Sequence, residues 1–223
     1  MYTRPSQPKG PLGFVVPPWY TNHAMSILLI DGENFRNKIK AVFEHAQKSH
    51  PNWHQYDFKG LLHQVLRGME IERIVFYFAR IKEHRDTKEK SQRLIQEQRL
   101  LKTHLERQGF EVILSGRVRG HLENSHKDKP VLVFKEKGVD VKIAVDMVSM
   151  ACDKKTTEIV LGSSDSDLQP AIEEATRRGI DCVYLGFELN PNKGISYTTK
   201  RTILIRNAEV IEFEEEQPRL IAA

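Results

Sequence analysis

A buried strand that ends in serines and aspartates is the feature that most constrains this chain. Residues 157–168 read TEIVLGSSDSDL. The apolar IVL run predicts a short strand that breaks at Gly162, and a helix follows with Asp167 as its N-cap and Pro170 in its first turn. Open α/β sheets bind ligands at the carboxyl ends of their strands, which makes Asp165 a candidate ligand-binding residue. The alternative is a turn followed by a helix cap, positions that aspartate and serine favour.

Two other parts of the chain repeat this design. The apolar run SILLI is followed at once by Asp31, with the amide of Asn34 three residues later. A third carboxylate, Asp140, follows KEKGV and opens a predicted helix over residues 140–152. Carboxylates from three separate elements converge only if the strands lie side by side and parallel. The sequence therefore predicts one acidic site at the carboxyl edge of a parallel sheet.

Apolar runs and helical periodicity alternate along the rest of the chain. This alternation predicts an α/β fold: a three-layer α/β/α sandwich of Rossmann type with a mainly parallel central sheet. The expected strands are 26–31, 74–78, 110–114, 158–161 and 181–185, with 131–134 as an edge strand, 203–205 near the end and 209–213 as a last strand. The expected helices are 35–48, 57–68, 87–108, 140–152 and 168–178. We expect a proline-rich arm over 1–24, one domain over 25–213 and a short acidic tail over 214–223.

The amino-acid composition indicates what class of protein this is and in which compartment it is found. With 223 residues, 39% hydrophobic and 29% charged, the chain reads as one soluble domain. No apolar run approaches the ~20 residues that span a bilayer, and the amino terminus lacks a signal-peptide pattern. Cys152 and Cys182 lie in apolar sequence, so we expect buried free thiols and a reducing cytoplasm. The net charge is +4, although several glutamates gather near the carboxyl terminus. A basic body favours a polyanionic partner, and the alternative is a solvated basic surface.

The acidic site suits a hard divalent cation. Neither a P-loop nor a G-x-G-x-x-G pattern occurs, and the histidines show no zinc spacing. Carboxylate ligands favour Mg²⁺ or Mn²⁺, with Asp31, Asp140, Asp165 and Asp167 as candidates. Such a metal supports phosphoryl transfer by activating water and neutralising developing charge. Asn34 would orient a carboxylate or a metal-bound water, and three serines would hydrogen-bond a phosphate or a ligand carboxylate: Ser163, Ser164 and Ser166.

Three motifs in this order resemble those of a known family. IDGENF at 30–35, KGVDVKIAVDM at 137–147 and SDSDLQP at 164–170 are similar to the NYN domain, and more narrowly to its LabA-like branch within the PIN-like nuclease superfamily. The resemblance covers about residues 25–186. It implies a PIN-like sandwich that cleaves RNA with a divalent metal, and it places catalysis on Asp31, Asp140, Asp165 and Asp167 with Asn34 beside them.

The chain departs from the family pattern without losing a carboxylate. The third motif is usually SGDSDF, whereas here Ser164 replaces the glycine and Leu168 the phenylalanine. Asp146 also matches a family position, but six residues beyond Asp140 it lies on a different helix face. The alternative for Asp146 is a helix charge paired with a lysine.

Basic residues that follow the strands are expected to hold the RNA backbone. The candidates are Arg80, Arg117, Arg119 and Lys137. The main interpretation is a metal-dependent ribonuclease acting on single-stranded RNA. Two others stay open: a non-catalytic RNA-binding or scaffold protein that keeps the fold, and a phosphatase of the haloacid-dehalogenase kind. In the phosphatases the first aspartate of D-x-D sits directly at the strand end, whereas here Gly-Ser-Ser intervenes.

The two ends of the chain carry apolar residues that the resemblance does not explain. The arm holds Phe14, Trp19 and Tyr20, and the expected last strand holds Val210 and Phe213. A proline-rich arm does not fold alone, so its aromatic residues dock on this domain or on another copy. We expect a homodimer to which the arm or the last strand contributes, and the alternative is a monomer that covers its own apolar surface.

Overall fold

The structure, a computed structural model, describes residues 26–83, 88–124 and 130–215. Its centre is a six-stranded sheet in which every neighbouring pair is parallel. Across the sheet the strands are β3 (Glu111–Ser115), β2 (Ile71–Ala79), β1 (Ser26–Asp31), β6 (Glu158–Gly162), β7 (Asp181–Phe187) and β8 (Arg201–Ile205). Numbered within the sheet, the order is 3-2-1-4-5-6, which confirms the predicted Rossmann-type architecture.

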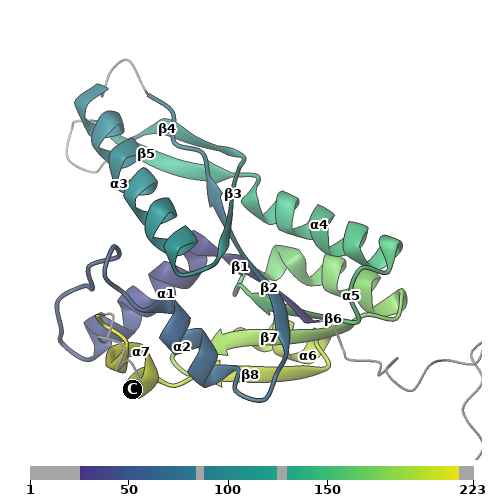
Figure 1. Cartoon of the computed structure of the whole chain (residues 1–223). Helices are drawn as coiled ribbons and strands as arrows, with labels where there is room; N and C mark the ends of the chain where they lie inside the picture. The colour runs from purple at the N-terminus through teal and green to yellow at the C-terminus, as the bar shows by residue number, and fades with distance from the viewer. Residues whose placement is uncertain (1–25, 84–87, 125–129, 216–223) are drawn as a thin grey trace, which may run out of the picture.

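Helices cover both faces of the sheet (Figure 1). One layer contains α1 (Gly32–His45), α2 (Phe58–Val65), α3 (Lys88–Arg107) and α7 (Asn207–Glu212). The other contains α4 (Val139–Asp153), α5 (Gln169–Arg177) and α6 (Lys193–Thr198). All six residues of β1 are buried, because alternate side chains enter opposite cores. Leu28 and Ile30 face the first layer, and Ile27 and Leu29 face the second. The expected three-layer sandwich is therefore confirmed.

A separate antiparallel hairpin replaces the expected edge strand and the polar excursion before it. It pairs β4 (Arg117–Asn124) with β5 (Pro130–Lys137) and projects beyond the main sheet (Figure 1). Gly116 leads into it with a φ of +69°, where a Cβ atom would lie 2.2 Å from the carbonyl oxygen of Lys137. Glycine at this position lets the chain leave β3 in the left-handed region and pass close to the strand that returns.

The predicted last strand was wrong, because residues 207–212 form helix α7. The side chain of Glu209 accepts a hydrogen bond from the Arg206 amide at 2.8 Å, which satisfies a free donor at the helix start. Val210 is fully buried, and its carbonyl oxygen accepts a hydrogen bond from the Tyr56 hydroxyl at 2.7 Å. This segment does not extend the sheet, so it offers no strand for pairing with another copy.

Two smaller expectations are also settled. Asp57, the first residue of the expected helix over 57–68, is the N-cap of α2, and its side chain accepts from the Gly60 amide at 2.7 Å. Cys182 is buried as expected, but Cys152 is exposed near the end of α4, so the prediction of two buried thiols was half wrong. Across the described ranges, no helix has the length and apolar character needed to cross a membrane.

Candidate metal centre

The strand order reverses between β1 and β6, and the predicted acidic residues gather there. Ile30 of β1 pairs with Gly162 of β6 at the end of the shared register, so Asp31 and the loop that begins at Ser163 leave the sheet side by side. Ligand sites in open parallel sheets form at such a switch point, because the loops of the two central strands diverge and leave a crevice.

Three carboxylates meet in this crevice, and we call them the acidic centre: Asp140, Asp165 and Asp167. Each offers an oxygen, and these oxygens all lie within 4.8 Å of one another. Asp140 stands in the first turn of α4, which begins after Gly138 at a φ of +89°. The other two belong to a 3₁₀ turn, η2 (Ser166–Leu168), that leads into α5. Within the described residues none of the three forms an ion pair, so their mutual repulsion is not offset by a lysine or arginine.

The cap at this turn is Asp165 and not Asp167. The Oδ1 atom of Asp165 accepts a hydrogen bond from the Asp167 amide at 3.0 Å, and α5 begins without a side-chain cap. The prediction of Asp167 as N-cap was therefore wrong, although Pro170 does stand in the first turn of α5. Because the turn is capped from its first carboxylate, the side chain of Asp167 is exposed and directed to the centre it shares with Asp140.

Asp31 borders the acidic centre but lies outside the group of three. Its Oδ1 atom caps α1 by accepting from the Asn34 amide at 3.0 Å, and the residue is 9% exposed. Burial raises the pKa of this carboxyl to about 6, with further contributions from the charges of Asp165 and Glu33. A buried carboxylate with a raised pKa beside other carboxylates is typical of a site that binds a cation or moves a proton.

Two asparagine side chains, one in α1 and one at the start of α6, fix the acidic loop in place. The Oδ1 atom of Asn34 accepts from the Ser164 amide at 3.0 Å, which ties the β1 end to the β6 end. Asn192 donates through Nδ2 to the Ser164 carbonyl at 2.9 Å and to the Ser166 hydroxyl at 3.0 Å. Sequence reasoning did not identify Asn192. Its position after Asn-Pro, as N-cap of α6, was the available indication.

The three predicted serines differ in their surroundings. Ser163 is 2% exposed, and its hydroxyl accepts from the Asp165 amide at 3.2 Å. The Ser164 hydroxyl is hydrogen-bonded to the Tyr184 hydroxyl at 3.1 Å. Ser166 is exposed and stands next to both aspartates of the turn. All three serine hydroxyls are hydrogen-bonded within the site, and Ser166 is the only exposed one of the three.

Asp146 is a helix charge paired with a lysine, which was the alternative interpretation of this residue. Its Oδ1 atom lies 2.6 Å from the Lys142 ammonium, and its Oδ2 atom accepts from the Tyr77 hydroxyl at 2.9 Å. Burial and the Asp146 charge raise the pKa of Tyr77, so this hydroxyl stays a donor. Asp146 thus supports the packing of α4 on β2 and is not part of the acidic centre.

Three of the four predicted RNA-binding cations come from neighbouring backbone segments. Arg80 follows β2, and its carbonyl oxygen accepts from the Val118 amide at 3.2 Å. Arg117 pairs across the hairpin with Lys137, which immediately precedes the turn into α4. All three side chains are exposed. The side chain of Arg119 lies outside the described part of the structure.

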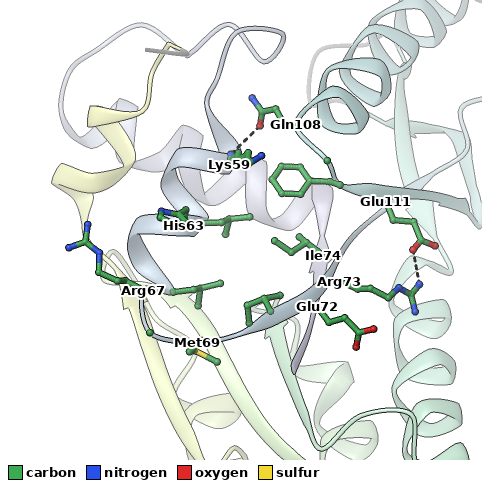
Figure 2. Close-up of a pocket in the computed structure, with 15 residues that line it drawn as sticks. Lys59, His63, Arg67, Met69, Glu72, Arg73, Ile74, Gln108 and Glu111 are labelled. Atoms are coloured by element: carbon green, nitrogen blue, oxygen red, sulfur yellow. Dashed lines mark hydrogen bonds and ion pairs between the residues drawn. The ribbon is translucent and has the colours of Figure 1, made fainter. Parts of the chain in front are cut away.

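Two cavities lie at opposite edges of the sheet. One, of about 520 Å³, opens at the amino edge between α2 and the starts of β2 and β3. Figure 2 shows Lys59 and His63 on one wall of this amino-edge cavity and Ile74 and Arg73 on the other, with Arg73 paired to Glu111 at 2.6 Å. It is remote from the aspartates. The other, of about 540 Å³, opens at the carboxyl edge beside α1 and is lined in part by Glu33.

The fold is a Rossmann-type α/β domain with an acidic centre at the switch point of its sheet. The NYN domain model matches residues 26–205, and the chain belongs to the NYN domain family. Among solved structures, a protein of unknown function from Vibrio parahaemolyticus RIMD 2210633 is 17% identical, with 83% of this chain and 95% of that chain covered and a TM-score of 0.49. No curated protein matches the sequence. The family is that of PIN-like nucleases, which use divalent metals.

Proposed function

We propose that this protein is a metal-dependent ribonuclease that hydrolyses phosphodiester bonds in single-stranded RNA. The observation that carries the proposal is the meeting of three carboxylate oxygens within 4.8 Å, without an ion pair in the described residues, in a chain of a PIN-like nuclease family. Carboxylates arranged in this way repel one another unless a cation lies between them. The donor set, all oxygen, fits Mg²⁺ or Mn²⁺.

Asp140, Asp165 and Asp167 would hold the cation, with Asp31 beside them. The bound ion would supply Lewis-acid chemistry for hydrolysis of a phosphodiester. Asn34 and Asn192 act as positioning residues, because their hydrogen bonds hold the loop that carries Asp165.

Phosphate binding falls to the exposed cations at the same edge. Arg80, Arg117 and Lys137 come from adjoining backbone segments near the start of α4, and Arg119 is expected to join them. Contacts of this kind bind the sugar–phosphate backbone without regard to sequence. A single strand suits the site, because one phosphodiester must reach carboxylates that stand between two loops.

The two other functions that the sequence leaves open fit the site less well. A scaffold protein has no need for three converging carboxylates that lack an ion pair in the described residues. A phosphatase of the haloacid-dehalogenase kind needs its nucleophile at the strand end, whereas Asp165 follows Ser163 and Ser164 and caps a 3₁₀ turn.

Cleavage of labelled single-stranded RNA tests the proposal against both. We expect cleavage with Mg²⁺ or Mn²⁺, none with EDTA, and no release of phosphate from a generic phosphatase substrate. RNA binding without cleavage under any metal would favour the scaffold, and metal-dependent phosphate release would favour the phosphatase.

The organisation of the chain is part of the proposal. We propose one nuclease domain over 25–213, a homodimer held by the arm over 1–24, and an acidic tail over 214–223. The free state of both cysteines fits the reducing cytoplasm that we propose as its location.

A further inference from the structure

The cavity at the carboxyl edge lies close to Asp31, which borders the acidic centre, and to the candidate phosphate-binding residues. We call it the Trp53 cavity. Its lining includes Glu33, which is two residues from Asp31 and close enough for its charge to raise the Asp31 pKa. It also includes Ala79 and Ile81, the two neighbours of Arg80, and Val118, the neighbour of Arg117. A strand whose phosphate lies at the acidic centre would therefore carry an adjacent nucleotide past the mouth of this cavity.

The walls of the Trp53 cavity suit a flat ring. Trp53 and Phe78 supply aromatic surface, and Leu94 and Leu101 of α3 supply aliphatic surface. The Arg36 guanidinium lies 4.6 Å from the centre of the Trp53 ring, which adds a second planar group to this wall. Aromatic rings and arginine planes are the surfaces on which unpaired bases stack.

Two polar atoms in this wall have no partner in the described part of the chain. They are Nε of Arg36 and Nδ1 of His54, and both are shielded from solvent. Buried polar groups are nearly always hydrogen-bonded. Because neither atom has accessible surface, a ligand in the cavity would bond to them only after the Arg36 and His54 side chains turn toward it. The edge of a nucleobase, with ring nitrogens and exocyclic groups, provides such partners.

The charge of the lining excludes a phosphate. Glu33 and Glu97 contribute two carboxylates, and Arg36 contributes one cation that is ion-paired to Glu33 at 3.1 Å. His54 adds little positive charge at neutral pH, because burial and the neighbouring positive groups lower its pKa. A neutral ring with a polar edge fits this lining, whereas an anion would be repelled.

We propose that the Trp53 cavity is a nucleobase subsite that holds the base of a nucleotide next to the phosphodiester at the acidic centre. The base stacks in the aromatic wall and directs its polar edge to Arg36 and His54. This inference rests on the proposed ribonuclease function, because it takes RNA to be the ligand of the neighbouring centre.

Binding in EDTA tests the subsite without cleavage. The probes are a fluorescein-labelled single-stranded RNA octamer of mixed sequence and an abasic octamer with the same backbone. We expect the unmodified protein to bind the RNA about ten-fold more tightly than the abasic strand, as stacking of one base allows. Trp53→Leu should remove most of this difference and leave the affinity for the abasic strand unchanged.

Two further variants guard against a change in folding. Leu94→Trp adds bulk to the Trp53 cavity from α3 and leaves Trp53 and Phe78 unchanged, and it should produce the same loss. His63→Ala changes an exposed residue of the amino-edge cavity and should leave both affinities as they are. The subsite is ruled out if the unmodified protein binds RNA and the abasic strand equally. It is also ruled out if neither Trp53→Leu nor Leu94→Trp changes the difference between the two affinities.

The cleavage assay separates the two proposals. If the unmodified protein cleaves RNA with Mn²⁺ but the cavity variants bind and cleave normally, the ribonuclease stands and the subsite fails. If it does not cleave, yet the cavity variants lose base-dependent binding, the subsite stands and the protein is an RNA-binding one.

Discussion

Replacing Asp31 with asparagine tests the electrostatics of the crevice. We expect Asp31→Asn to stabilise the metal-free protein at pH 7 by about 3 kcal/mol. The substitution keeps the shape of the side chain and its role as N-cap of α1, because an asparagine oxygen also accepts from the Asn34 amide. Asparagine and aspartate cap helices about equally well, so the main change is the loss of the buried charge.

The magnitude follows from the pKa of Asp31. Burial first, and then the charges of Asp165 and Glu33, raise this pKa from 3.8 to about 6. A shift of about two units corresponds to ~3 kcal/mol of preference for the protonated form in the folded state. Because the folded pKa is raised, Asp31 contributes stability that is complete below pH 3.8 and is lost as the pH rises through 6. The advantage of Asp31→Asn should therefore be full at pH 7 and absent near pH 4.

Urea unfolding in EDTA between pH 4 and pH 8 measures this difference. We expect the free energies of unfolding of the two proteins to diverge between about pH 4 and 6 and to run parallel above pH 7. Added Mn²⁺ should stabilise the unmodified protein more than the variant, because binding to the folded state adds to its stability. A difference that does not change with pH, or a less stable variant at pH 7, would show that the buried Asp31 charge does not destabilise the metal-free protein.

Three other predictions concern the RNA contacts, the packing behind the site and the assembly. Replacing Arg80, Arg117 and Arg119 together with alanine should weaken binding to every RNA sequence alike and flatten its salt dependence. A loss of binding confined to particular sequences would contradict this. Gly32→Ala should destabilise the protein by ~1–3 kcal/mol in urea unfolding, because its Cβ would lie 2.2 Å from the Phe78 ring, and an unchanged midpoint would show that the ring moves freely. Light scattering should give a dimer for the full chain and a monomer for a chain that starts at Ala24, and a monomeric full chain at micromolar concentration would exclude the homodimer.

The sheet and the convergence of its acidic loops could be predicted from the sequence, because both follow from the apolar run of each strand and the residue that comes after it. A strand such as β1, with both faces buried, has an unbroken apolar run, and the residue after it leaves at the carboxyl edge. Adjacent parallel strands then bring Asp31 and Asp165 near each other. The sequence does not reveal that the Asp31 side chain caps α1. With its side chain in this cap, Asp31 lies outside the acidic centre.

The errors arise where short segments fit two structures. The EVIEF stretch over 209–213 alternates well enough for a strand, but Val210 packs as part of a one-sided helix next to Tyr56. In the DSD of the third motif, either aspartate is a reasonable cap, and only the hydrogen bond from Asp167 to Asp165 decides between them. Asn192 was missed because it reaches the acidic loop from a different strand end, a contact that no local pattern encodes.

Single-turnover cleavage by Asp165→Asn is the most direct test of the central claim. Asp165 belongs to the acidic centre, whereas Asp153 is an exposed aspartate at the end of α4, paired to Lys155 at 2.9 Å, and Asp153→Asn is the matched control. With single-stranded RNA and Mn²⁺, we expect cleavage by the unmodified protein and by Asp153→Asn. We expect none by Asp165→Asn, whose circular dichroism should be unchanged. Cleavage by purified Asp165→Asn at the rate of the unmodified protein would contradict this claim.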